Sequence, residues 1–125
     1  MYLDTHVAIW IAEKKLRKLS RKAISAIEGS GLIYLPAMVE LELQVLSEIG
    51  KIKVTPKEII ASLSKNLDLQ ISTVLFYDVC DEAKSLSWTR DLFDRLIVAE
   101  AKCAGNAPLI TADANIHEHY KHAVW

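Results

Sequence analysis

Short apolar segments alternate with segments of helical spacing along the whole chain, and this alternation limits the possible folds more than any other feature. The segments expected as strands are 1–4, 32–36, 69–76, 108–113 and 122–125. Helices are expected around 7–11 and across 20–29, 39–50, 56–66, 81–88 and 91–105, with a helical turn or loop at 114–120. Because no hairpin signal joins consecutive strands, the sequence predicts an α/β fold with a mainly parallel central sheet.

The composition favours one compact unit over residues 1–125. The chain has 125 residues, of which 51% are hydrophobic, and it contains no internal repeat, linker or low-complexity segment. The formal net charge of -1 neither favours nor excludes a nucleic-acid partner, so only local clusters of charge can indicate one.

The N-terminal segment lacks the pattern of a signal peptide, because Asp4 and His6 interrupt it almost at once. No apolar run approaches the ~20 residues of a membrane span. Cys80 and Cys103 stand apart from any metal-binding spacing and are expected to be small core residues in a reducing compartment. We therefore expect a cytoplasmic protein without a membrane contact.

Three acidic residues stand where predicted strands end or helices begin. Asp4 follows the first strand, Asp113 follows the strand at 108–113, and Asp94 lies in the first turn of the helix that Asp91 opens. Taken alone, each acid has a simpler interpretation, because Asp is a common helix cap and complements the positive end of a helix. In a parallel sheet, however, these positions converge on one edge, which is where ligands bind.

The helix expected at 39–50 carries two further carboxylates, Glu40 and Glu42, and helical spacing places them on different faces. Glu42 shares its face with apolar residues three and four positions away, whereas Glu40 lies on a side that Gln44 continues toward solvent. A carboxylate on a core-facing stripe is costly unless it is paired or binds a metal. Glu42 is therefore a candidate ligand, with a pairing to an arginine as the alternative.

Four carboxylates in one cleft would repel one another by about 4 kcal/mol per close pair at an effective dielectric near 20. They would therefore take up protons or bind a cation. Oxygen ligands suit Mg²⁺ or Mn²⁺, and one or two such ions can activate water for in-line displacement at phosphorus. The sequence thus favours hydrolysis of a phosphodiester.

The ordered acids Asp4, Glu42, Asp94 and Asp113 resemble those of the PIN-domain nucleases, specifically the VapC-type toxins of bacterial and archaeal toxin–antitoxin pairs. The segments that carry the resemblance span essentially the whole chain: YLDTHVAIW, IYLPAMVELEL, RDLFDRLIVAEA and PLITAD. The resemblance implies a PIN-like α/β/α sandwich in which these four acids form the catalytic metal site. Pro36, Thr89 and Leu92 depart from the Ser, His and Pro that relatives commonly carry.

The same resemblance implies further residues and partners. Thr5 and Thr111 match hydroxyl positions that in relatives hydrogen-bond the acids or the bound water. The implied activity is that of an endoribonuclease dependent on Mg²⁺ or Mn²⁺, usually a homodimer, which a cognate VapB-like antitoxin silences.

Basic residues near the acids are candidates for RNA contacts. Lys14 and Lys15 belong to the basic run KKLRKLSRK, whose alternative role is that of a solvated connection between helices. Arg90 and Arg95 flank Asp94 and could instead form structural ion pairs with Asp91, Glu100 or another acid.

Two other functions compete with the nuclease. Asp4 could be the nucleophile of an aspartate-based phosphatase, although His6 occupies the place where a second Asp would be expected. The chain could also be a catalytically silent PIN-fold module that binds a protein, although all four acids are retained. A zinc site built from His117, His119 and His122 has little support, because their segment lacks partner ligands.

Overall fold

Five short strands form one parallel sheet at the centre of the molecule, in a computed structural model that describes residues 1–125. Their order in the sheet is β3-β2-β1-β4-β5, and every neighbouring pair is parallel, as the sequence predicts. The strands are β1 (Tyr2–Leu3), β2 (Ile33–Leu35), β3 (Leu69–Ile71), β4 (Leu109–Ile110) and β5 (Ala123–Val124).

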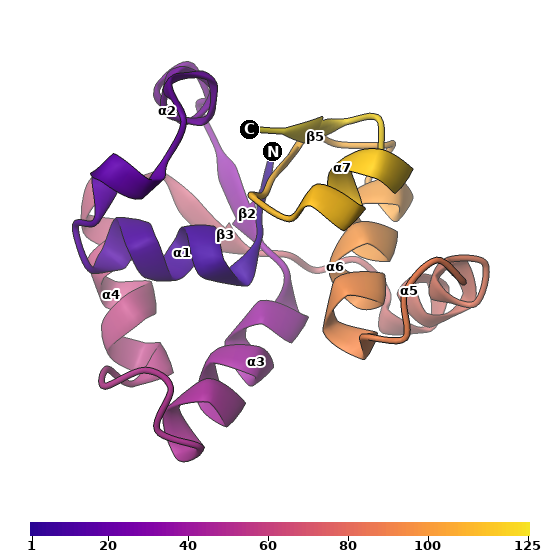
Figure 1. The fold of residues 1–125 in the computed structure, drawn as a ribbon, viewed down its shortest axis with the longest axis horizontal. Coiled ribbons are helices and arrows are strands. Elements are labelled where there is room, and N and C mark those ends of the chain that lie inside the picture. The colour runs from indigo at the N-terminus through magenta and orange to yellow at the C-terminus, as the bar shows by residue number, and fades with distance from the viewer.

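Helices cover both faces of this sheet. Figure 1 shows α1, α2 and α4 on one side of the strands and α5 and α6 on the other, which gives an α/β/α sandwich. The helices are α1 (Thr5–Ala12), α2 (Arg21–Glu28), α3 (Ala37–Glu48), α4 (Pro56–Asn66), α5 (Phe76–Ala83), α6 (Leu92–Cys103) and α7 (Ala114–His119), with a 3₁₀ turn, η1, at Leu16–Lys18. None of them combines the length and hydrophobicity that a bilayer span requires.

The capping residues expected from the sequence occupy the helix ends. The Ser20 side chain accepts a hydrogen bond from the backbone N–H of Ala23 at the start of α2, and Gly29 is the C-cap of that helix. The helix α4 has Pro56 in its first turn and a reciprocal capping box between Thr55 and Glu58. These side chains satisfy backbone groups that would otherwise lack partners at helix ends.

The prediction for 69–88 is wrong in two places. The strand expected over 69–76 ends at Ile71, because its one partner strand, β2, ends at Leu35, which pairs with Ile71. The helix expected over 81–88 begins earlier and spans Phe76–Ala83. Val79 and Ala83, which lie four residues apart on one face, are the buried residues of α5. The helix therefore packs against the rest of the molecule through a narrow apolar stripe.

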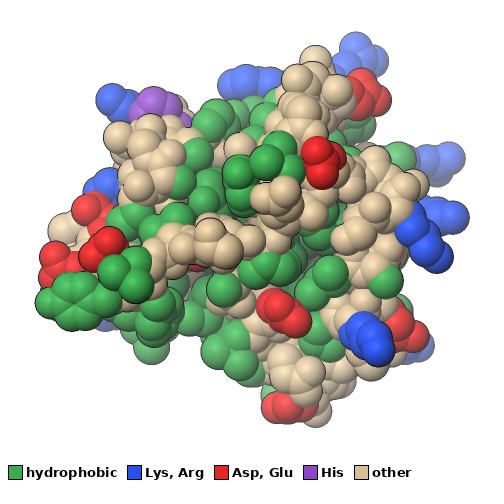
Figure 2. Space-filling view, turned by 180° about the vertical axis from the view of Figure 1, so that it is seen from behind, with side chains coloured by type: hydrophobic (Ala, Val, Ile, Leu, Met, Phe, Trp, Pro, Cys, Tyr) green, Lys and Arg blue, Asp and Glu red, His purple; other side chains and the backbone are tan.

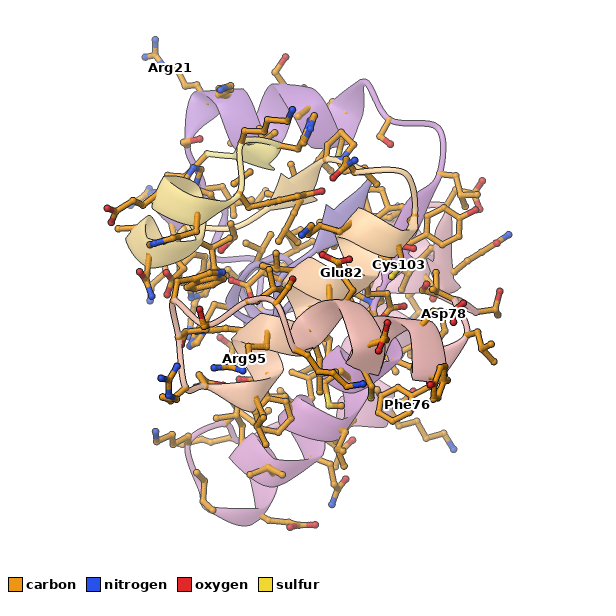
Figure 3. The ribbon with its side chains drawn as sticks, turned by 90° about the vertical axis from the view of Figure 1, so that its right-hand side faces the viewer. Arg21, Phe76, Asp78, Glu82, Arg95 and Cys103 are labelled. Carbon is orange, nitrogen blue, oxygen red and sulfur yellow. The ribbon has the colours of Figure 1, made fainter.

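The core lies between the sheet and its two helical layers. Leu3, Leu35 and Ile110 from the strands and Leu43 and Ile97 from the helices have no exposed surface. The expectation that both cysteines belong to this core is wrong, since Cys80 is half-buried and Cys103 is exposed. Figure 3 shows Cys103 at the end of α6 beside α5, where its thiol donates to the Asp78 carbonyl across 3.6 Å. A thiol is small enough to occupy this helix–helix border without entering the core.

Candidate functional site

The strand order places a topological switch between β1 and β4. The chain passes from β1 outward through β2 to β3 and then returns to the other side of β1 to form β4. The backbone N–H of Asp4, just after β1, donates to the carbonyl of Ile110 in β4 over 3.0 Å. Helices that follow neighbouring strands diverge at such a point, which leaves room for a ligand at the carboxyl ends.

Asp4 is the most enclosed acid at this edge, with only 7% of its surface exposed. One carboxylate oxygen, Oδ1, accepts the Thr5 backbone N–H at 2.6 Å, and the other, Oδ2, accepts the Thr111 hydroxyl at 2.7 Å. Burial raises the pKa of Asp4, and the hydrogen bond from Thr111 opposes that increase. The carboxylate is therefore fixed in orientation by groups from both sides of the switch.

Thr5 also connects Glu42 to Asp4 through hydrogen bonds. The Thr5 hydroxyl donates to Oε2 of Glu42, while the backbone N–H of Thr5 donates to Asp4, so one residue positions two acids. Burial raises the pKa of Glu42, and the charge of Asp4 adds to the increase. Glu40 is exposed, which confirms that the two glutamates of α3 face different surroundings.

Asp94 lies in the first turn of α6 and is half-buried. Burial raises its pKa to about 7, with further increases from the negative charges of Asp91, Asp113, Asp4 and Glu42. The four sequence-predicted acids therefore lie within electrostatic range of one another. Figure 1 shows the starts of α1, α3, α6 and α7 around the middle of the molecule. Asp4 and Asp113 are the N-caps of α1 and α7, Asp94 is in the first turn of α6, and Glu42 is in α3.

Asp113 is more exposed and also caps α7. Its Oδ1 accepts the backbone N–H groups of Asn115 at 2.8 Å and Ile116 at 3.0 Å, as the capping interpretation predicts. Its own N–H donates to the Thr111 hydroxyl over 3.0 Å, and that hydroxyl in turn donates to Asp4. Thr111 thus links the acids at the ends of β1 and β4.

The chemistry of the donor set fits a hard divalent cation, although the side chains are not closed around one point. No three acidic, His or Cys side chains are placed closely enough to hold one ion together. None of the four acids forms an ion pair; the ion pairs of the molecule join Lys15 to Glu13, Lys84 to Asp81 and Lys102 to Glu82. Partly buried carboxylates without a basic partner are the ligands that Mg²⁺ and Mn²⁺ use.

The predicted basic residues divide into two groups. The Arg90 guanidinium donates to the Ser87 carbonyl at 2.7 Å, and the Arg95 Nε donates to the Thr89 carbonyl at 2.7 Å. Neither arginine forms an ion pair with an acid, so both brace the loop before α6. Lys14 and Lys15 lie in the turn after α1, where Lys15 pairs with Glu13 at 2.6 Å.

The three C-terminal histidines have separate surroundings. The Nε2 of His117 is 2.8 Å from the Thr111 carbonyl oxygen, which helps to fix the residue that positions Asp4. The ring of His119 stacks on Trp88 with 5.0 Å between centroids, and His122 lies against Tyr120.

Two residues at the site were not singled out from the sequence. Asp91, treated only as a cap, accepts the N–H groups of Phe93 and Asp94 and also contributes to the raised pKa of Asp94. His6 lies close enough to Asp4 and Glu42 for its charge to lower the pKa of both acids. The sequence feature that could have identified His6 as a site residue is its position two residues after Asp4. In the structure it lies on the exposed side of the first turn of α1.

Comparison with known proteins places the chain in a structural context. The family model described as PIN domain matches residues 1–122. A toxin–antitoxin complex from Klebsiella pneumoniae contains a chain with 18% identity and a TM-score of 0.64, and the match covers 99% of this chain and 95% of that one. VapBC2 from Rickettsia felis, bound to a DNA fragment from its promoter, gives 16% identity and a TM-score of 0.64 over 98% and 93%. No curated protein sequence matches.

Proposed function

The chain belongs to the PIN-domain family, and from this premise we propose that it is a metal-dependent endoribonuclease of the VapC toxin type. The observation that carries the proposal is the electrostatic cluster of Asp4, Glu42, Asp94 and Asp113 at the switch point, with no basic partner among them. A group of acids that repel one another is costly for folding, and a bound cation removes that cost.

The residues would divide their roles by how firmly they are held. Asp4 and Glu42 are fixed by hydroxyl donors from Thr5 and Thr111, so they are the acids best prepared to bind an ion. Asp94 and Asp113, at helix starts, would complete the ligand set by small side-chain movements. Threonines that hold carboxylates in orientation act as the supporting groups that metal ligands commonly require.

The proposed cofactor is Mg²⁺ or Mn²⁺, one or two ions, held by these four acids. When bound, such an ion supplies an activated water and stabilises negative charge on the phosphate. Asp94 would have to release its proton before binding, since its pKa is about 7 without a cation. In-line hydrolysis of an RNA strand would leave a 5′-phosphate and a 3′-hydroxyl.

The proposed protein partners are a VapB-like antitoxin and a second copy of the chain. Support for an antitoxin comes from the two solved structures above, both of which contain toxin–antitoxin components. Figure 2 shows hydrophobic side chains gathered over α5 at the left of the rear face, and Figure 3 shows Phe76 at the start of that helix. Large apolar side chains that gather on a surface commonly mark protein contacts. The exposed ones here are Leu75, Phe76 and Tyr77 at the start of α5 and Leu92 at the start of α6.

The direct test is cleavage of a mixed RNA pool by the purified protein with Mg²⁺, with Mn²⁺ or with EDTA. We expect cleavage that requires the metal and that falls at least about a hundredfold in Asp4→Asn and Glu42→Gln. Glu40→Gln is the matched control, because it makes the same chemical change on the same helix but at an exposed position. Cleavage that survived both substitutions, or that Glu40→Gln abolished equally, would contradict the proposal.

The same experiment separates the two rival functions. An aspartate phosphatase would release phosphate from a small phosphomonoester and leave RNA intact. A silent module would cut neither substrate under any metal condition while still folding.

A further inference from the structure

A groove between α1 and α3 has His6, in the first turn of α1, at one end and lysines at the other. It has a volume of about 310 Å³ and is bordered by His6 and Trp10 on α1, Leu46 on α3, and three lysines. The lysines are Lys15 and Lys18, which follow α1, and Lys51, which follows α3.

Helical spacing fixes the direction of this groove. His6 and Trp10 are four residues apart on one face of α1, and Leu46 is one turn beyond Glu42 on α3. The end nearest the acids lies at His6, which is in the first turn of α1, two residues after Asp4, the N-cap of that helix. Both helices therefore lead away from the candidate active site, and the groove continues it.

The far end of the groove is positively charged. Lys18 lies over the Trp10 ring with its Nζ 5.1 Å from the centroid, and Lys51 is exposed and forms no ion pair. Lys15 is matched by Glu13, so the two unmatched lysines give the groove a net positive charge. Asp4 is the N-cap of α1 and Lys18 follows its C-terminal end, so a helix about 12 Å long lies between these two residues along the chain.

The middle of the groove offers an aromatic surface. The His6 side chain is exposed, and its ring centroid is 6.1 Å from that of Trp10. Trp10 in turn contacts Trp125, with 5.9 Å between centroids, so the imidazole lies at an angle beside an indole ring that a second indole supports. Aromatic faces beside a positively charged groove are the combination by which proteins bind single-stranded nucleic acid without reading its sequence.

We propose that this groove binds the single-stranded RNA next to the phosphate that is cut, with one base stacked on His6 and the adjoining phosphates bound by Lys18 and Lys51. The inference rests on the nuclease function proposed above and assigns the path of its substrate. An acidic peptide would also satisfy the lysines, but it would leave the His6 ring without a stacking partner. The alternation of acids, aromatic rings and lysines along one groove therefore favours RNA.

The test measures RNA binding apart from cleavage, using the full chain in EDTA and a fluorescently labelled single-stranded RNA of mixed sequence. The key variant is Lys18→Gln/Lys51→Gln, and its matched control is Lys65→Gln/Lys121→Gln, which removes the same charge from exposed positions outside the groove. His6→Ala probes the stacking position separately. Circular dichroism would confirm that each variant is folded.

The groove variant should bind RNA about tenfold more weakly and show a salt dependence shallower by roughly 0.7 per lost phosphate contact. His6→Ala should weaken binding at least about fivefold without changing the salt slope, since stacking involves no counterion release. The control pair should alter neither quantity appreciably. If the nuclease proposal alone fails, these binding effects will persist although no RNA is cut with Mg²⁺ or Mn²⁺.

Three results would overturn the proposed RNA path. The wild-type chain could fail to bind RNA, or the groove and control pairs could weaken binding equally, which would indicate a diffuse effect of charge. Unchanged RNA binding in the groove pair would leave the groove as a surface for a protein partner.

Discussion

The acidic edge of the sheet and the α5–α6 corner both gather charged side chains, yet they arrange them in opposite ways. In the corner, Lys102 pairs with Glu82 between the helices, and Lys84 pairs with Asp81 at 2.8 Å within the α5 region (Figure 3). At the edge, Asp4, Glu42 and Asp94 lie among further acids and have no basic partner. The charges of the corner neutralise one another, whereas at the edge the proposed cation would neutralise them.

This difference implies opposite relations between charge and stability. Removing a charge in the corner breaks a favourable pair, whereas removing one at the edge relieves repulsion and desolvation. Under the proposed function, folding stability and activity compete at the edge, as is common at sites that bind a charged ligand. Four predictions test or refine this contrast.

The largest effect is expected from Asp94→Asn. Cleavage of RNA should fall at least about a hundredfold, because the substitution removes a proposed metal ligand. The metal-free variant should nevertheless unfold at a higher temperature than the wild type at pH 8, since an ionised Asp94 is disfavoured in the folded protein. Thermal unfolding in EDTA measures this, and a lower melting temperature at pH 8 would break the contrast.

The next effect concerns the threonine that links the two strand ends. Thr111→Val keeps the shape of the buried side chain but removes the hydroxyl that donates to Asp4 and accepts from Asp113. We expect a loss of about 1–2 kcal/mol in the free energy of unfolding, together with weaker metal binding, because the Asp4 carboxylate loses its orientation. Urea titration with and without Mn²⁺ measures both, and metal binding equal to that of the wild type would show that Thr111 has only a structural role.

The pH dependence of stability gives a third measure. The pKa of Asp94 is about 7 in the folded protein against an ordinary 3.8, so folding favours its protonated form. The contribution of protonated Asp94 to the free energy of unfolding is complete below about pH 4 and is lost as the pH rises through 7. Burial raises the pKa of Asp4 and Glu42 in the same direction.

The metal-free protein should therefore lose roughly 1 kcal/mol between pH 5 and pH 8, after allowance for solvent screening of the half-buried Asp94. Excess Mg²⁺ at pH 8 should restore the loss. Denaturant unfolding across this range measures the change. Stability that rose with pH in EDTA would contradict the electrostatic account of the edge.

The smallest effect is expected in the α5–α6 corner. Glu82→Gln removes the partner of Lys102, and both side chains are about one-third exposed. The free energy of unfolding should fall by less than about 1 kcal/mol, with RNA cleavage unchanged. A loss of cleavage in this variant would show that the two regions are coupled.

Much of the architecture could be predicted because local signals agreed with the final packing. Ser20, Pro56, Asp91 and Gly105 mark helix ends in the sequence and lie at or next to them in the structure. The inner strands β1, β2 and β4 are largely buried on both faces, so their short apolar runs were also recognisable. The parallel sheet followed from the alternation of these elements.

The errors in the predicted elements arose where apolar residues are exposed on the surface instead of buried in the core. Leu75 and Phe76 are exposed apolar residues, and they extended the predicted strand into what is the start of α5. Nothing in the sequence distinguishes such surface apolar residues from buried ones, because their partner would be another molecule.

The sequence indicated which acids lie near one edge of the sheet, but not how their side chains are held there. The order of the four acids and the helical face of Glu42 were available from spacing alone. The link from Thr5 to both Asp4 and Glu42, and the contribution of Asp91 and His6, depend on tertiary contacts between α1, α3 and α6. Distances between separate elements cannot be read from the spacing within each.

The most direct test of the central claim, that the acidic edge binds a divalent cation, is calorimetric titration of Mn²⁺ into the RNA-free protein at pH 7.5. The wild type and Glu40→Gln should bind the ion saturably and release protons, whereas Glu42→Gln should bind it at least about tenfold more weakly. Absence of binding in the wild type, or equal binding by Glu42→Gln and Glu40→Gln, would contradict the claim.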